Sequence, residues 1–134
     1  MLPLVVVAVV MVTALVTVVT DVGALWLSRR SLQATVDGAA LAGARAVDLA
    51  AIYAGGSTGD LALDPPAVRV AVRDYTRAIP SVRELAGFRV VSVRVSGAVV
   101  TVRANALVRL PFVALVTSRS IVIAAEASAR TSVG

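Results

Sequence analysis

The first 27 residues constrain this chain more than any other part of it. Met1 to Thr20 reads MLPLVVVAVVMVTALVTVVT without a charged side chain, and the apolar character continues past Asp21 to Leu27. Twenty helical residues rise by ~30 Å, the thickness of a bilayer's hydrocarbon core. A cleaved signal peptide has a shorter apolar region and a basic start. We therefore predict a single membrane-spanning helix over about residues 2–27, with Trp26 at the membrane interface.

The composition agrees with a membrane-associated protein. Hydrophobic residues make up 58% of the 134 residues and charged residues 16%, which is more apolar and less charged than an average soluble domain. The formal net charge is +5, and every basic residue is an arginine. This charge favours an anionic neighbour such as lipid headgroups. No basic run is interleaved with aromatic side chains, so we expect no nucleic-acid partner.

The residue types that support most enzyme chemistry are missing. Histidine and cysteine are absent from the sequence, which removes a histidine base, a thiol nucleophile and an ordinary zinc site. The eight acidic residues are widely spread. Gly55-Gly56 lacks the Lys-Ser/Thr pair that a phosphate-binding loop needs. We therefore expect a protein that is not an enzyme and has no cofactor or metal.

The helix is predicted to continue beyond the membrane. No proline occurs between Arg30 and Pro65, and the segment is rich in alanine and leucine, which are strong helix formers. We predict one continuous helix over residues 1–54, extramembrane from about residue 28, and ended by GGSTGD at 55–60.

Small residues four positions apart recur on this helix. Gly38 and Ala42 form one such pair, and Ala39 and Gly43 form another. Pairs of this kind let another backbone approach closely. Two partners stay open, the protein's own sheet and the helix of a neighbouring subunit, and a helix with this many small residues could contact both.

Residues 55–134 are predicted to form a small α+β domain. Asp64 followed by two prolines marks the start of a second, short helix that ends at Pro80, and Ser81 and Glu84 have the spacing of a capping box. From Phe88 the apolar period changes to two. A hairpin turn at Ser96-Gly97 then joins strands in 88–95 and 99–108, and a third strand follows in 120–130.

The fold class is therefore α+β, with a long N-terminal helix and an antiparallel sheet of about three strands. In the first strand, Val91, Val93 and Val95 are predicted to share one face of the sheet because they alternate with polar side chains.

Two sets of charged side chains are candidate contact sites. Asp21 lies near the end of the span, either at the headgroup level or in a polar seam for a neighbouring helix. Arg69, Arg73 and Arg77 form a stripe on the second helix. This stripe is either a solvated face or a contact for anionic lipid or an acidic partner.

A motif in the small-residue segment resembles a known family. LQATVDGAALAGARA (32–46) follows the pattern Gln-x-x-x-Asp-x-Ala-Ala-Leu-Ala-x-Ala found after the membrane segment of TadE/TadG-like proteins of the tight-adherence (Tad, Flp-type) pilus system. VSGAVVTVRANALVRLPF (95–112) is similar to the later hairpin of that family. The positions that match the motif are Gln33, Asp37, Ala39, Ala40, Leu41, Ala42 and Ala44.

The resemblance implies a type IV pilin-like fold and a structural role. The chain would be a minor pilin or pseudopilin, with membrane lipid, other pilin subunits and the pilus assembly platform as partners. Its C-terminal domain would be extracytoplasmic, with the cell-surface pilus as a further location. The residues expected at helix-packing contacts in the assembly are Asp21, Gln33, Asp37, Gly38, Ala39, Ala42 and Gly43.

Other readings stay open beside this one. The chain could be a membrane-anchored extracytoplasmic binding module that does not polymerise. A cytoplasmic regulatory domain on a single anchor is favoured by Arg29 and Arg30 alone, because the positive-inside rule places basic residues in the cytoplasm. Val5 stands where type IV pilins carry a glutamate, which fits a processed form, a late start or an unprocessed member.

Overall fold

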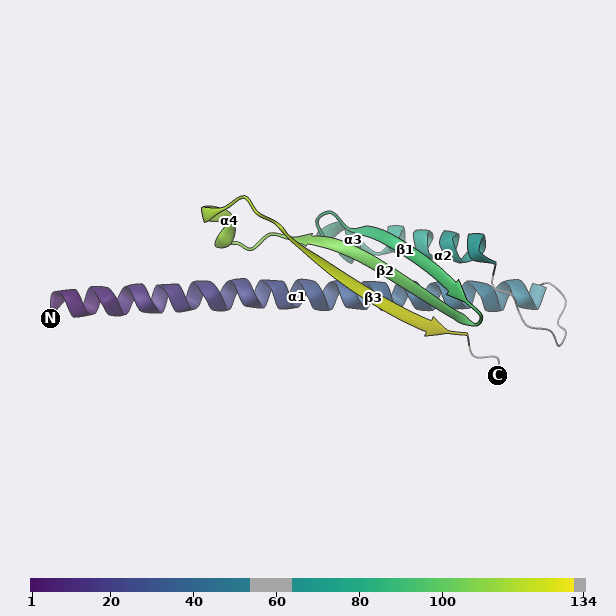
Figure 1. The fold of residues 1–134 in the computed structure, drawn as a ribbon, viewed down its shortest axis with the longest axis horizontal. Coiled ribbons are helices and arrows are strands. Elements are labelled where there is room, and N and C mark those ends of the chain that lie inside the picture. The colour runs from purple at the N-terminus through teal and green to yellow at the C-terminus, as the bar shows by residue number, and fades with distance from the viewer. Residues whose placement is uncertain (54–63, 132–134) are drawn as a thin grey trace.

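The structure is a computed structural model that describes residues 1–53 and 64–131, with side chains for 1–46 and 64–131. The predicted helix end at 55–60 lies outside the described residues. The fold class is confirmed: a long helix precedes short helices and a three-stranded antiparallel sheet (Figure 1). The elements are α1 (Leu2–Tyr53), α2 (Pro65–Ala78), α3 (Pro80–Glu84), β1 (Arg89–Ser96), β2 (Val99–Val108), α4 (Val113–Val116) and β3 (Ile121–Arg130).

Helix α1 runs without a break through the predicted membrane boundary. It is the one described helix that is long and apolar enough to cross a membrane. From Leu2 to Thr20 every residue is exposed except the half-buried Thr17, so none of the residues that the structure describes covers the apolar segment. The threonine hydroxyls in the segment donate to carbonyls four residues earlier, as Thr13 does to Val9 at 2.8 Å. Their polar groups are thereby satisfied without a neighbouring helix.

The sheet has the order β1-β2-β3, and each neighbouring pair is antiparallel. The hairpin turn is Gly97-Ala98, one residue later than predicted, because Ser96 still pairs with Val99. Gly97 has φ +56°, a conformation that glycine adopts without strain.

A bulge corrects the predicted face of β1. The register shifts between Val90 and Ser92, so Val91 is an extra residue and is half exposed. Val90 and Val93, not Val91, pack against the core. The alternation rule fails here because it assumes that every residue of the strand is paired.

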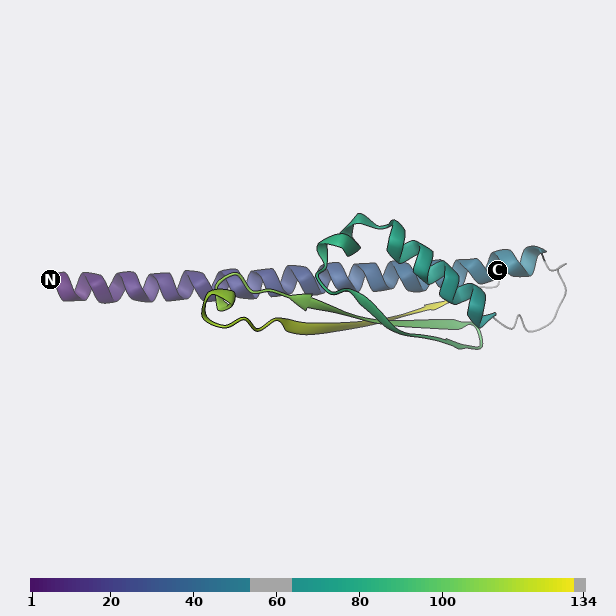
Figure 2. The ribbon, with the colours of Figure 1, turned by 90° about the horizontal axis from the view of Figure 1, so that it is seen from above.

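Helices α1 and α2 cover one face of the sheet. α1 lies along β2 and β3, and α2 runs obliquely beside α1 (Figure 2). The core between the layers contains mostly valine and alanine, with one leucine of α1, Leu32, fully buried. Small side chains on both surfaces allow the helix to lie close to the sheet.

The starts of the two short helices are only partly as predicted. Asp64 is the N-cap residue of α2 and Pro65 follows it, although the Asp64 side chain makes no capping hydrogen bond. The Ser81–Glu84 capping box is not formed, because α3 already begins at Pro80 and its N-cap residue is Ile79.

Candidate interaction surfaces

The small-residue face of α1 packs inside the protein. Ala39 is buried, and a Cβ atom at Gly43 would lie 3.2–3.3 Å from methyl groups of Val68, Val72 and Val100. The contacts of these residues are therefore with the chain's own α2 and β2. Of the two partners left open by the sequence, the protein's own fold is the one that covers them.

Gly38 meets α2 rather than the sheet. A Cβ atom there would lie 1.9 Å from the hydroxyl oxygen of Tyr75 and 2.6 Å from its ring carbon Cζ. The glycine leaves room for the half-buried tyrosine, and this is a reason within the chain itself for a small residue at this position.

Gln33 and Asp37 connect α1 to the sheet edge. The Gln33 side-chain amide donates to the Asp37 carboxylate at 3.0 Å and to the backbone carbonyl of Glu126 on β3 at 3.2 Å. Both side chains remain exposed at the surface. The two polar positions of the motif thus orient β3 along α1 and still face solvent.

Asp21 has partners within the chain. Its carboxylate accepts hydrogen bonds from the backbone N–H groups of Phe112 at 3.2 Å and Val113 at 3.3 Å, and the residue is 7% exposed. This contact joins the end of the membrane span to α4 across more than ninety residues of sequence. Neither the headgroup-level reading nor the polar-seam reading anticipated it, since no local pattern marks a partner so distant in sequence.

A different side of α1, above the span, is not covered by any part of the chain that the structure describes. Ala34, Asp37, Leu41 and Arg45 are exposed and recur at a helical spacing, while Ala42 beside them is half-buried. Leu41 is 46% exposed, although it is the largest apolar side chain of the motif. This surface, called here the Leu41 face, is available to a second helix.

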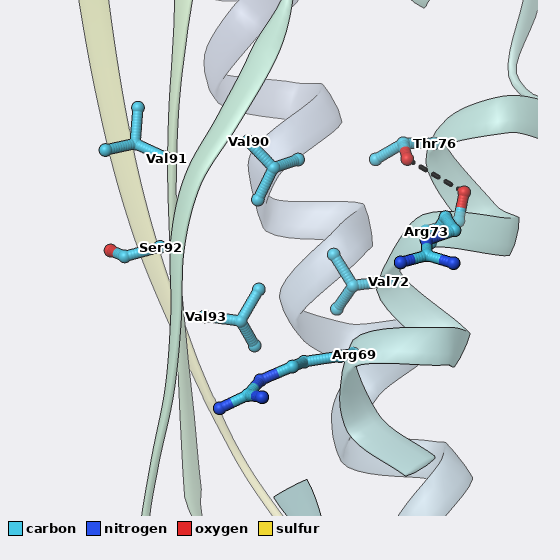
Figure 3. Close-up of a pocket in the computed structure, with 8 residues that line it drawn as sticks. All are labelled: Arg69, Val72, Arg73, Thr76, Val90, Val91, Ser92 and Val93. Carbon is cyan, nitrogen blue, oxygen red and sulfur yellow. Dashed lines mark hydrogen bonds between the residues drawn. The ribbon is translucent and has the colours of Figure 1, made fainter. Parts of the chain in front are cut away.

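The arginine stripe borders a groove between α2 and β1. Arg69 and Arg73 line a cavity of about 400 Å³ together with valines of both elements, whereas Arg77 does not line it. In Figure 3 the guanidinium group of Arg69 extends from α2 toward β1, and Val90 and Val93 point toward α2. The groove combines an apolar floor with positive charge, so it suits a partner that presents apolar and acidic side chains.

The titratable side chains do not gather into a metal or catalytic cluster in the part of the chain that the structure describes. No group of three or more acidic residues in that part is positioned to hold a metal ion. The one ion pair of the described residues joins Arg103 of β2 to Glu126 of β3, with both side chains about half exposed. The surfaces described above are suited to binding, through packing and charge.

Residues 1–46 match the family model Tad, described as "Putative Flp pilus-assembly TadE/G-like". This segment is TadE/G-like. The match covers the membrane span and the Gln33–Ala44 motif, and it confirms the resemblance read from the sequence. The family description names Flp pilus assembly, and the match is confined to the first 46 of the 134 residues.

The other comparisons add no relatives. Neither the curated proteins nor the solved structures gave a match to this chain.

Proposed function

We propose that this protein is a minor pilin or pseudopilin, a structural subunit of a Tad-type pilus or a related secretion assembly. The TadE/G-like match of residues 1–46 supports the pilus context. The observation that carries the structural role is the uncovered apolar segment of α1, which is exposed from Leu2 to Thr20 apart from Thr17. Such a surface requires lipid or neighbouring helices around it.

In this proposal the helix changes its surroundings during assembly. Lipid surrounds α1 until the subunit is taken up, and other subunit helices then replace lipid along the span. Because lipid tails are as apolar as valine, this exchange is driven by packing between helices rather than by the hydrophobic effect. The Leu41 face extends the same contact above the membrane, and the domain stays extracytoplasmic.

A photo-cross-link tests the proposal. The chain has no cysteine, so Val16→Cys and Leu41→Cys each provide one thiol on the exposed side of α1 to which a thiol-reactive benzophenone is attached. In cells that express the whole pilus system, illumination is expected to join each labelled variant to another pilus subunit through insertion of the benzophenone into a C–H bond of the neighbour. Ser96→Cys, at the exposed end of the hairpin, is the matched control and should remain monomeric. Monomeric Val16→Cys and Leu41→Cys proteins in piliated cells would contradict the proposal.

The groove between α2 and β1 favours a second candidate, a membrane-anchored binding module that does not polymerise. Two arginines and an apolar floor at one site suit recognition of a partner protein. In that case Arg69→Gln/Arg73→Gln would abolish partner capture, and the labelled thiols on α1 would give no subunit cross-link. A gene neighbourhood without a pilus ATPase and a membrane platform would also favour this candidate.

A further inference from the structure

The segment between β2 and β3 exposes large apolar side chains that the sheet does not use. Leu115 is 81% exposed and Val116 is 85% exposed, and all residues from Pro111 to Val122 are exposed. Phe112, Val113 and Val122 add to the same surface. An exposed apolar cluster of this kind on a small domain indicates a surface that contacts a membrane or another protein.

The position of this segment beside α1 indicates that the apolar partner is the membrane. Asp21 holds the backbone of Phe112 and Val113, so the start of α4 lies beside residue 21 of α1. Asp21 is six residues before Leu27, the predicted end of the span, which corresponds to ~9 Å along the helix. Figure 1 shows α4 at the end of the sheet that faces the N-terminus, alongside α1. The exposed apolar side chains are therefore level with a part of α1 that lies in the membrane.

Basic side chains flank the apolar turn at the strand ends. Arg109 follows β2 and Arg119 precedes β3, and both line a cavity of about 290 Å³ with Ser118 and Ser120. Two guanidinium groups and two hydroxyl groups are donors without a negative charge among them, which is the donor set that a phosphate group needs. The cavity also includes Ala114 of α4, so the two arginines lie beside the apolar turn. Apolar side chains next to long basic ones, which can extend to the headgroup level, match the two parts of an anionic phospholipid.

We propose that residues 110–120 form a second membrane contact. The apolar side chains of α4 enter the lipid beside α1, and Arg109 and Arg119 bind the phosphate of an anionic phospholipid. The contact fixes the height and tilt of the domain on the bilayer, because the domain is then held at α1 and at α4. The inference depends on the membrane span and not on the proposed pilus role, so either can fail without the other.

The depth of α4 is the first test. Leu115→Cys carries a nitroxide label in the full-length chain, reconstituted at one copy per nanodisc of phosphatidylglycerol and phosphatidylcholine. The label is expected to collide often with oxygen, which concentrates in lipid, and rarely with a water-soluble nickel complex. A label at Val22→Cys, within the span, provides the lipid-exposed reference. A label at Ser96→Cys provides the water-exposed reference. Nickel access at position 115 equal to that at position 96, or shielding from both reagents, would overturn the membrane contact.

Lipid selectivity is the second test. The full-length protein is released from nanodiscs with equal amounts of the two lipids, and the retained lipid is identified by native mass spectrometry. The wild type is expected to retain phosphatidylglycerol in preference to phosphatidylcholine. In Arg109→Gln/Arg119→Gln the ratio of retained phosphatidylglycerol to phosphatidylcholine is expected to fall by on the order of 5-fold for each arginine removed. Arg94→Gln/Arg130→Gln is the matched control and should behave as the wild type. Equal retention by both double variants would overturn the headgroup site.

Inorganic phosphate separates a lipid headgroup from a free anion. In nanodiscs of phosphatidylcholine alone, titration with inorganic phosphate is expected to show no saturable binding that depends on the two arginines. Saturable binding by the wild type that Arg109→Gln/Arg119→Gln abolishes would assign the cavity to free phosphate and overturn the lipid assignment.

Discussion

At the scale of single residues, Gly43 has a role that the sequence left open. A Cβ atom at this position would lie 3.2–3.3 Å from three valine methyl groups, so the atoms of a leucine beyond Cβ would have to displace them. Gly43→Leu is expected to lower the free energy of unfolding by about 1–3 kcal/mol through overpacking. Gly23→Leu is the matched control, because nothing lies within 4 Å of a Cβ there. Guanidinium unfolding of both full-length variants in detergent measures the difference, and equal stability would contradict the packing.

The same result changes how assembly defects are interpreted. Loss of pili in a Gly38 or Gly43 variant does not by itself indicate a subunit interface, because a side chain at either position also disturbs packing within the subunit. An interface residue is one whose substitution leaves the stability of the subunit unchanged.

Asp21 is a second residue with a structural role that can be measured. Asp21→Ala leaves the N–H groups of Phe112 and Val113 without their acceptors, which is expected to cost about 1–3 kcal/mol. Asp21→Asn keeps one acceptor oxygen and should lose less. Amide hydrogen exchange at residues 112 and 113 is expected to accelerate in the order wild type, Asn, Ala. Unchanged exchange in Asp21→Ala would show that the contact does not form.

At the scale of elements, the Leu41 face should govern contacts between subunits. Leu41→Glu places a charge on an exposed side of α1, so we expect the free energy of unfolding to change by less than about 0.5 kcal/mol. Pilus assembly should nevertheless fall, because the neighbouring helix would have to bury that charge. Arg94→Glu, on the exposed side of β1, is the control. Normal piliation by Leu41→Glu would remove this face from the proposal.

The elements also show what the sequence can predict and what it cannot. The apolar run, the absence of proline between Arg30 and Pro65 and the alternation in 99–108 predict α1 and β2 closely, because each is a local feature of the sequence. Val90 and Val91 are both apolar, so they fit either register, and the bulge cannot be read from them. The contact of Asp21 with Phe112 and the cover over Gly43 depend on residues distant in sequence, which no single-sequence pattern identifies.

The candidate interaction surfaces were also predictable only in part from the sequence. The motif predicted that close approach occurs at Gly38, Ala39 and Gly43, and the structure shows close approach within the chain. Arg69 and Arg73 line a groove, but the stripe alone could not separate them from Arg77. The run FVALV marks an apolar turn at α4 in the sequence. That these side chains are exposed could not be predicted from the run, because exposure depends on where β2 and β3 end in the folded chain.

At the scale of the whole molecule, two arguments disagree about the side of the membrane on which the C-terminal domain lies. The positive-inside rule would place Arg29 and Arg30 in the cytoplasm, whereas the pilus role that we propose requires a domain outside the cytoplasm. The guanidinium carbon of Arg30 lies 5.4 Å from the centre of the Trp26 ring. A cation held over an interfacial indole is stabilised there on either side of the membrane.

Trypsin treatment of spheroplasts decides between the two arguments. All arginines follow the span, so an extracytoplasmic domain is expected to be degraded in intact spheroplasts while a cytoplasmic marker protein survives. Arg29→Gln/Arg30→Gln should remain equally accessible, because these charges do not set the orientation in our proposal. A domain that is protected until lysis, and becomes accessible in the double variant, would show that the two arginines do hold it in the cytoplasm. The pilus role would then fail, while the contact of α4 with lipid would still apply on the other leaflet.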